Sequence, residues 1–545
     1  MSTSLPPPQS ATSDEATDLF AAVDMGTNSF KLLIFRADPS TGRFLPINVF
    51  KEPVLLGIDT TTTSAAAVIT PASTDRAIAA LIKFQEILQS NRIPASQCRV
   101  VATSAVREAS NQSQFLSFVN QKVDLQIKVL SGQEEARLIY LGVLQLLPVI
   151  EDTVLNVDIG GGSTEFIIGH NGNILYSISL KLGHVTLTQQ FSDTRQMREH
   201  IRTVFKSSGL VDKIKDYRIN KVTGSSGTIK SIEEAVYKGY AKKRVENARR
   251  DSYSDWKFSK EELMELVDSF EMEGKENRKS FFRKRAEFIV AGAVLLEEAF
   301  ESLGIMEMEV SEYALAEGVV AEMLGIDESL KVDMRWGSVV RLATRLCSKK
   351  KMKTAAFCAR ISKEIFDGIR KLNVTANNEL LKNMEDRDIE YLEAACLLHK
   401  IGLIAGNKGY HKQSYQLITK GNHLQGYNDD EIMFIGLLVK HHRKGFPKAD
   451  DTSMQGFTEE VKHKFTMLCA ILRLSAVIEQ LQSLDCPRYT LSHSPEGFRL
   501  VLEVRNRPSP HGSLQLQAEM VKEELDKEVA NFSEVFGEKL SVVVH

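Results

Sequence analysis

Cysteine is scarce in this chain, and long hydrophobic runs are missing from it. The 545 residues include six cysteines, which are scattered and form no C-x-x-C pair. We therefore expect reduced thiols rather than a disulfide framework or a cysteine-type zinc site. No run reaches the roughly 18 apolar residues that a membrane-spanning helix needs, so no contact with the membrane interior is expected. The cysteines are Cys98, Cys347, Cys358, Cys396, Cys469 and Cys486.

An excess of one charge sign is also missing. The formal net charge is -3, with 43% hydrophobic and 26% charged residues, which is ordinary for a globular protein. Without a global basic field, binding to nucleic acid or to an acidic membrane surface is not indicated. A polyanionic ligand would have to be bound by local positive sites. Reduced thiols favour a cytoplasmic location.

The first 18 residues lack both an apolar core and arginine. A secretory signal needs the apolar core, and a transit peptide is rich in arginine, so neither is expected. The segment 1–18 is predicted to be a disordered tail.

Two segments of the chain resemble each other at a constant offset. FAAVDMGTNSFKLLIF and TVLNVDIGGGSTEFIIG align Asp24 with Asp158, Gly26 with Gly160, and Ser29 with Ser163. Both read as a strand, a glycine-containing turn and a second strand. An internal repeat predicts two lobes of one ancestral design. If the two turns face each other, the ligand site is expected in the cleft between the lobes.

The pattern of strands and helices divides the chain into four parts after the tail. Strands alternate with helices in 19–150 and again in 151–325, which predicts two α/β lobes. Long amphipathic patterns in 334–482 predict an all-helical domain. The segment 488–545 is expected to form a small α+β appendage of two strands, a helix and a final strand.

Some individual elements can be placed more closely. The expected segments are helices at 73–90, 133–147, 389–398, 430–440, 465–480 and 517–536, strands at 99–102, 126–130 and 540–544, and solvated helices at 240–250 and 257–285.

The two matching turns carry residues that suit phosphate binding. Glycine lets backbone N–H groups converge on phosphate oxygens, and hydroxyls add donors. Three carboxylates there, Asp24, Asp158 and Glu165, would repel phosphate unless a cation lies between them, which suggests Mg²⁺ or another divalent cation. Ordinary hairpin turns could contain the same residues, but the duplication favours a functional role. The candidate phosphate-binding residues are Gly26, Thr27, Asn28, Ser29, Gly160, Gly161, Gly162, Ser163 and Thr164.

A third loop, Gly224-Ser225-Ser226-Gly227-Thr228, is predicted to join a strand to a helix. Such a turn offers an anion site at the helix N-terminus. Lys230 would lie in the first helical turn, where a cation opposes the helix dipole and is easier to explain beside an anion. A plain helix cap with an exposed lysine is the alternative, and the pattern does not decide between them.

Arg107 is a second cation expected near a helix N-terminus. It lies three residues after Ser104, a plausible N-cap, at a position where the helix dipole favours an anion. Its guanidinium could grip a phosphate with two hydrogen bonds. An ion pair with Glu108 is the alternative.

The segment Ser131-Gly-Gln-Glu134-Glu135 matches the capping-box pattern, in which Glu134 would reach back to the cap. Glu135 is turned about 100° around the helix and is free for another role. It could take a proton from water beside a phosphorus atom. From the pattern alone, however, a first-turn glutamate that stabilises the helix dipole is the favoured interpretation.

Histidines cluster in the helical part, around His399, His411 and His441-His442. Histidines can bind metals, but no carboxylates stand beside them and Lys400 would repel a cation. We therefore favour a structural or phosphate-contacting role. The basic runs at 241–244 and 349–351 are expected to be solvated.

Five motifs, in order, resemble the exopolyphosphatase / guanosine pentaphosphate phosphohydrolase family over about residues 19–325. They are AAVDMGTNSF, ATSAVREA, VLSGQEEARLIYLGV, NVDIGGGSTEFIIG and TGSSGTIKS. The resemblance implies an α/β fold of two actin-like (ribonuclease H-like) lobes. LLHKIG, GYHKQS and HHRK resemble, less strictly, the HD-like C-terminal domain of the longer members.

The resemblance also implies roles for residues of this chain. It marks Glu135 as the catalytic base, against the favoured interpretation of the pattern, and places Asp158 and Glu165 around the divalent cation. Arg107 matches the arginine of the family's T-x-x-x-R-x-A motif, and the three glycine loops would hold phosphate. The expected activity is release of the terminal phosphate from polyphosphate or a phosphorylated guanosine nucleotide.

Two departures from the family pattern limit this expectation. Ala314-Leu-Ala316-Glu-Gly318 replaces a G-L-R-E-G-like segment, so contacts to the substrate would differ. Lys400 replaces the aspartate of metal-binding HD domains, which argues against a second hydrolase centre. We expect that domain to shape a channel or the interface of a homodimer. A non-catalytic sensor of phosphorylated ligands and a small-molecule kinase are the alternatives.

Overall fold

A computed structural model of the chain describes residues 18–56, 67–147, 151–240, 257–272, 275–326, 333–376, 384–443, 445–447, 454–480, 488–503 and 513–544. The tail expected at 1–18 lies outside these residues except for Asp18, and the basic run at 241–244 lies outside them entirely.

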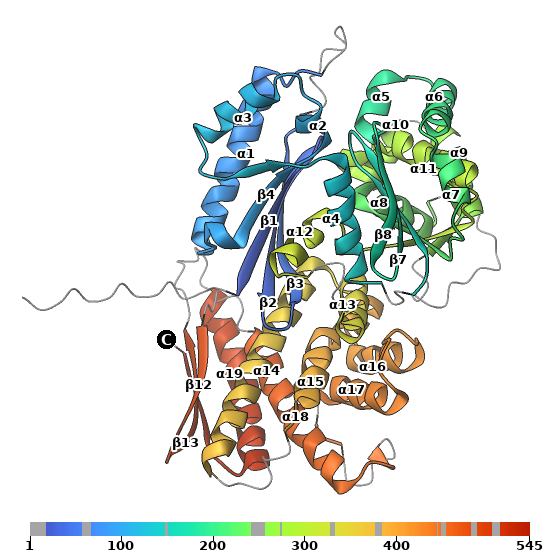
Figure 1. The fold of residues 1–545 in the computed structure, drawn as a ribbon. Coiled ribbons are helices and arrows are strands. Elements are labelled where there is room, and N and C mark those ends of the chain that lie inside the picture. Colours follow the sequence, from blue (N-terminus) through green and yellow to red (C-terminus); the bar gives the residue numbers. More distant parts are fainter. Residues whose placement is uncertain are drawn as a thin grey trace, which may run out of the picture.

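The first lobe is a five-stranded sheet of order β3-β2-β1-β4-β5, covered by helices on both faces (Figure 1). Successive side chains of β1 point to opposite faces: Ala21 and Val23 pack with α1, while Ala22 packs with α4. Pro71 and the Thr70 cap, whose side chain accepts from Ser73 N, fix the start of α1. The elements are β1 Leu19–Met25, β2 Ser29–Asp38, β3 Arg43–Pro53, α1 Pro71–Ser90, η1 Ala95–Gln97, β4 Cys98–Ala102, α2 Ser104–Arg107, α3 Gln112–Asn120, β5 Ile127–Val129 and α4 Gly132–Leu144.

The second lobe repeats this topology. Its sheet, of order β10-β11-β9-β6-β7-β8, reproduces the first one with β6, β7, β8, β9 and β11 in place of β1 to β5, plus an antiparallel edge strand. Even the strand irregularities match: the register shifts after Ile34 in β2 and after Ile168 in β7. The predicted internal repeat therefore extends to the whole lobe.

The second lobe surrounds its sheet with helices, of which α11 is the most buried. The elements are β6 Val154–Ile159, β7 Thr164–His170, β8 Asn173–Leu180, α5 His184–Gln190, α6 Thr194–Ser207, α7 Leu210–Lys215, β9 Lys221–Ser225, α8 Ser226–Tyr237, β10 Lys257–Ser259, α9 Lys260–Met272, α10 Lys275–Phe282, η2 Arg283–Arg285, α11 Ile289–Leu303 and β11 Glu307–Val310. The next helix, α12 Leu315–Met323, returns to the first lobe and packs against α4 and β1.

The C-terminal part lies below both lobes in Figure 1 and consists of helices with a small three-stranded sheet. Buried Arg473 of α18 pairs with Glu528 of α19 at 2.5 Å, which ties the appendage to the helices. The elements are α13 Met334–Leu346, α14 Lys349–Ala376, α15 Asp386–Leu398, η3 Ile401–Ala405, α16 Tyr410–Lys420, α17 Asp429–His441, α18 Glu459–Ile478, β12 Arg488–Ser494, β13 Gly497–Glu503, α19 Ser513–Phe536 and β14 Leu540–Val544.

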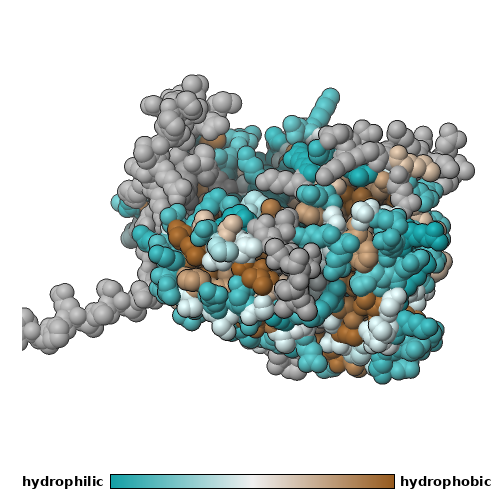
Figure 2. Space-filling view, turned by 90° about the horizontal axis from the view of Figure 1, so that it is seen from above, coloured by the Kyte–Doolittle hydropathy of each residue, from teal (hydrophilic) through white to brown (hydrophobic). Residues whose placement is uncertain are grey.

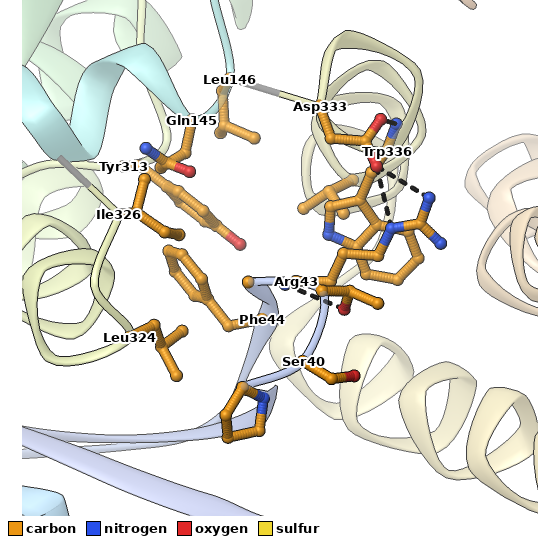
Figure 3. Close-up of a pocket in the computed structure, with 14 residues that line it drawn as sticks. Ser40, Arg43, Phe44, Gln145, Leu146, Tyr313, Leu324, Ile326, Asp333 and Trp336 are labelled. Atoms are coloured by element: carbon orange, nitrogen blue, oxygen red, sulfur yellow. Dashed lines mark hydrogen bonds and ion pairs between the residues drawn. The ribbon is translucent and has the colours of Figure 1, made fainter. Parts of the chain in front are cut away.

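Arg43, in the hairpin of the first lobe, anchors the helical domain to that lobe. Its guanidinium donates to Asp333 at 2.7 and 2.9 Å and lies 5.1 Å from the centre of the Trp336 ring (Figure 3). Beside it is a cavity of about 250 Å³ lined also by Phe44 and Tyr313. Among the residues lining this cavity, none is a candidate catalytic or phosphate-binding residue from the sequence.

The predicted fold class is confirmed: two α/β lobes, then an all-helical domain and a small α+β appendage. One expectation was wrong, because residues 257–259 form strand β10 rather than part of a solvated helix. None of the described helices combines the length and apolar composition needed to cross a bilayer. On the face in Figure 2, hydrophobic residues form separate patches between hydrophilic ones.

Candidate active site

The turns of the two lobes touch each other. A Cβ added to Gly161 would lie 2.8 Å from Cβ of Thr27, and one added to Gly162 would lie 2.7 Å from Oγ of Ser104. Side chains at 161 and 162 would therefore push the lobes apart, which explains glycine at both positions. Gly26, Asn28, Ser29, Gly160, Ser163 and Thr164 belong to or flank the same two turns, so all the candidates from this repeat lie together.

Asp24 near the end of β1 and Asp158 near the end of β6 face cross-strand neighbours of opposite charge. Asp24 is paired across the hairpin with Lys31, whose Nζ lies 3.0 Å from its Oδ2. At the equivalent place in the second lobe, Asp158 is paired with Glu165. Asp158 accepts a hydrogen bond from Ser225 Oγ at 2.5 Å, and Glu165 accepts one from Ser179 Oγ at 2.7 Å. Asp24 is thus neutralised within its own lobe, and the second lobe holds two buried acids side by side.

Glu135 lies in the first turn of α4 and is only 7% exposed. Ser131 caps this helix by accepting from Glu134 N at 3.1 Å, as the sequence predicts. The expected return contact of the capping box is wrong: the Glu134 carboxylate binds Arg137 and Lys128 instead. Glu134 is therefore engaged at the surface while Glu135 points into the protein.

Arg107 binds Glu135 directly, from Nη1 to Oε2 at 2.7 Å, and the same nitrogen donates to the carbonyl of Leu130 at 3.1 Å. The expected contact with Glu108 is also present, at a longer 3.4 Å. The expected N-cap was wrong by one residue, because Thr103 holds the cap position of α2 and Ser104 begins the helix. Arg107, from the helix that follows β4, thus holds the carboxylate of Glu135, from the helix that follows β5.

The acids share an environment that disfavours their charges. The pKa of Glu135 is raised to about 7: burial is the main cause, Arg107 opposes the rise, and the charges of Asp24 and Asp158 add to it. Burial, followed by repulsion from Glu135 and Asp158, raises the pKa of Glu165 well above its usual range. Burial raises the pKa of Asp158 as well. Three acids that repel one another in a buried place are what a divalent cation would stabilise, so their chemistry fits the expected metal.

The third loop joins β9 to α8 at the same place, as predicted. Ser226 has a φ of 90°, an unusual value for a residue other than glycine, and its buried Oγ has no hydrogen-bond partner among the described residues. Strain and an unsatisfied donor at a helix N-terminus are features of a ligand site. Thr228 bonds His184 Nδ1 at 3.1 Å, and Gly224 and Gly227 flank Ser225 and Ser226.

Lys230, for which the pattern left open an anion site or a plain exposed lysine, donates to the carbonyl of Glu312 at 2.6 Å and pairs with its carboxylate at 3.2 Å. The negative charge beside Lys230 is therefore supplied, at least in part, by the protein's own Glu312. Lys230 also interacts electrostatically with Asp158 and with Lys349 of α14.

Sequence reasoning missed several cations that surround the acids. A Cβ on Gly227 would lie 2.1 Å from Nη2 of Arg285, so this guanidinium lies flat against the third loop. Burial and then Arg285 lower the pKa of Lys51 to about 8 and that of His184 to about 3. We call the set formed by Lys31, Lys51, Lys230, Arg285 and Lys349 the basic rim; it draws on both lobes and on the helical domain.

The basic rim differs from a solvated surface patch. Lys51 and Lys349 are open to solvent, yet burial is the main cause of the lowered pKa of each. Lys31 could have been found from the repeat, since it stands where the second lobe has Glu165. Arg285 lies in a charged stretch that reads as solvated, and the sequence offers no signal for it.

The histidines of the helical domain lie apart from these acids. His399 and His442 are buried, with rings 5.0 Å apart, and Tyr410 bonds Nε2 of His442 at 3.0 Å. His411 lies 6.5 Å from His442.

Comparison with known proteins identifies the family of this chain. Residues 34–326 match the model of the Ppx/GppA phosphatase family, and residues 335–528 match domain III of Ppx/GppA phosphatases. The chain belongs to the Ppx/GppA phosphatase family.

Two similar proteins illustrate how far the likeness extends. The guanosine-5'-triphosphate,3'-diphosphate pyrophosphatase of Pseudoalteromonas translucida is 27% identical over 519 residues, which covers 92% of this chain and 96% of that protein. The crystal structure of an exopolyphosphatase from Cytophaga hutchinsonii is 29% identical with a TM-score of 0.50 and covers 58% of this chain and 99% of that chain.

The two departures from the Ppx/GppA pattern can now be placed. Glu317 reaches back to Ala314 N at 2.8 Å and so caps α12. Ala316 is buried and can supply no charge. Lys400, in the place of an HD aspartate, forms an ion pair with Glu479.

Proposed function

We propose that this member of the Ppx/GppA family releases the terminal phosphate from inorganic polyphosphate or from a guanosine penta- or tetraphosphate, with Glu135 as the general base. The observation that carries this proposal is the position of Glu135. Its carboxylate is buried, lies among the acids of both turns, and has a pKa of about 7. A base acts best when its pKa lies near the working pH.

The polyanion would be bound by donors from three directions. The glycine turns at Gly26 and Gly160–Gly162 and the free hydroxyl of Ser226 suit the terminal phosphoryl group. The basic rim suits the phosphates that follow it, because lysine and arginine supply the local positive sites that the acidic chain as a whole lacks. Since Lys349 belongs to α14, the helical domain would take part in binding a long chain.

Asp158 and Glu165 are the side chains that would hold Mg²⁺ or another divalent cation. Asp24, also expected from the sequence, is a weaker candidate because Lys31 already neutralises it. When bound, the cation would neutralise phosphate oxygens and lower the pKa of the acids around it. Glu135 would then accept a proton from the attacking water while Arg107 holds its carboxylate in place.

Phosphate release by the purified chain tests this proposal. Polyphosphate, guanosine pentaphosphate, guanosine tetraphosphate and GTP are each incubated with the protein, with and without Mg²⁺. We expect Glu135→Gln to lower kcat by about 10²–10⁴-fold, the usual loss when a general base is removed. Glu134→Gln is the matched control, because it removes a neighbouring carboxylate that binds Arg137 and Lys128 at the surface instead of facing the other acids.

Two outcomes would contradict the proposal. Turnover by Glu135→Gln at the rate of the Glu134→Gln control would exclude Glu135 as the base. Tight binding of one of these ligands without phosphate release from any of them would favour a sensor, which is the alternative function for such a chain.

A further inference from the structure

We propose that Cys358, His399 and Glu479, inside the helical domain, form a binding site for a zinc-like divalent cation. The three residues come from different helices: Cys358 from α14, His399 from the end of α15, and Glu479 from the end of α18. Their ligand atoms all lie within 4.8 Å of one another. This proposal is independent of the phosphohydrolase function.

All three side chains are removed from solvent, with 0%, 0% and 2% of Cys358, His399 and Glu479 exposed. Nε2 of His399 and Oε2 of Glu479 lie 3.3 Å apart and form an ion pair if the ring is protonated. With a neutral ring, neither atom has a hydrogen-bond partner in the described part of the chain. Buried polar atoms without a partner destabilise a fold by about 1–3 kcal/mol each. Two such atoms that face each other require an explanation.

The hydrogen bonding of His399 determines which nitrogen is available. Nδ1 lies 2.6 Å from the carbonyl oxygen of Cys396. Because a carbonyl oxygen only accepts, Nδ1 carries a proton, so Nε2 is the nitrogen that can bind a metal when the ring is neutral. Metal-binding histidines usually have this arrangement, in which the other ring nitrogen donates to a backbone carbonyl.

The donor set indicates the class of metal. A thiolate, an imidazole nitrogen and a carboxylate oxygen are the ligands of Zn²⁺, whereas Mg²⁺ prefers oxygen alone. A second thiol, that of Cys396, lies beside Cys358 and contacts Ser362 Oγ at 3.1 Å. The carboxylate that the sequence motif lacks beside His399 is supplied from α18, so the site could not be read from the local pattern.

A protein-only ion pair is the competing explanation. Lys400 pairs with Oε1 of Glu479, and a protonated His399 would complete a cluster of two cations and one anion. That cluster needs no sulfur. Because Lys400 occupies Oε1 of Glu479, the ion pair and the metal would both use Oε2 of Glu479, so this oxygen does not distinguish them. The role of Cys358 therefore separates the two explanations.

Cobalt titration of the full-length protein, stripped of metal with a chelator, tests the site. Co²⁺ replaces Zn²⁺ in such sites and gives a near-ultraviolet thiolate-to-metal absorption band. We expect this band to saturate with stoichiometric metal and to disappear when Zn²⁺ is added. Cys358→Ser should abolish the band, and a chelator competition should show Zn²⁺ affinity lower by about 100-fold or more.

Cys469→Ser is the matched control, since Cys469 is an equally buried thiol on α18 that contacts the carbonyl of His441 instead. It should bind Co²⁺ and Zn²⁺ as the unaltered protein does. Circular dichroism establishes that both variants are folded, and phosphate release is not part of the readout. Failure to bind Co²⁺ or Zn²⁺, or equal binding by Cys358→Ser and the unaltered protein, would overturn the proposal in favour of the ion pair.

Discussion

Arg107 donates from Nη1 to Oε2 of Glu135 across 2.7 Å, so the arginine expected to grip phosphate is bound to the proposed base. Burial and the charges of Asp24 and Asp158 raise the pKa of Glu135, the positive charge of Arg107 lowers it, and the balance is a pKa of about 7. This contact makes Arg107 a positioning residue for Glu135 as well as a candidate ligand of the substrate.

Removal of Arg107 should change the pH dependence of the reaction. A carboxylate base works only when deprotonated, so activity falls as the pH drops through its pKa. Because Arg107 lowers that pKa, Arg107→Ala should shift the acid limb of the kcat profile by about 1 unit or more to higher pH. Arg107→Lys keeps the charge and should restore part of the shift. A higher KM with an unmoved acid limb would show that Arg107 binds substrate without acting on Glu135.

Mg²⁺ should stabilise the folded protein through Asp158. A ligand present at 100 times its Kd stabilises the native state by about 2.7 kcal/mol, and each kcal/mol raises Tm by about 2–4 °C for domains of this size. Asp158→Asn should lose most of the Mg²⁺-dependent rise in Tm. Asp193→Asn, which keeps an N-cap side chain on α6 in the same lobe, should retain it. Equal Mg²⁺ effects in both variants would place the cation elsewhere.

Contact between the lobes can be tested at Gly162. A methyl group there would meet Ser104 Oγ at 2.7 Å, and crowding of this kind destabilises a packed contact by about 1–3 kcal/mol. We expect Gly162→Ala to lower kcat by about tenfold or more, since small displacements of reacting groups have large effects on rate. Adding Ser104→Ala removes the clashing oxygen and should recover part of the loss. Full activity of Gly162→Ala alone would show that the turns do not meet during the reaction.

Arg285 should matter for the binding of long substrates. Hydrogen bonds to a charged partner contribute about 1.5–3 kcal/mol, so Arg285→Ala should raise KM for polyphosphate about tenfold or more and change kcat less. Arg283→Gln removes an exposed cation two residues away and serves as the control. If the two variants have the same KM, Arg285 makes no contact with the chain of phosphates.

The sequence predicted the repeated parts of this molecule better than the parts brought together by folding. Asp24 and Asp158 could be aligned because the repeat keeps their spacing, and the equivalence holds down to the register shifts after Ile34 and Ile168. Secondary structure in the helical domain followed from its amphipathic pattern. These signals are local, so they survive in a single sequence.

Contacts between residues far apart in the sequence could not be predicted, for a physical reason. Arg285 meets Gly227 and Glu479 meets His399 only after helices pack, and neither pair leaves a periodic trace in the sequence. The pattern also favoured a structural role for Glu135, because a first-turn glutamate is common at helix N-termini. Only its burial among other acids distinguishes it from Glu134.

The helices α4 and α12 approach each other through glycines on both sides. A Cβ on Gly142 would lie 2.1 Å from the carbonyl oxygen of Ala314, and one on Gly318 would lie 1.7 Å from that of Leu138. Their backbones are therefore in direct contact and can slide or tilt only as a pair. Since Glu135 lies two turns before Gly142 on the same rigid helix, any swing that separated the lobes to admit a substrate would carry the proposed base with it. The movement that admits the ligand would then also set the position of the Glu135 carboxylate.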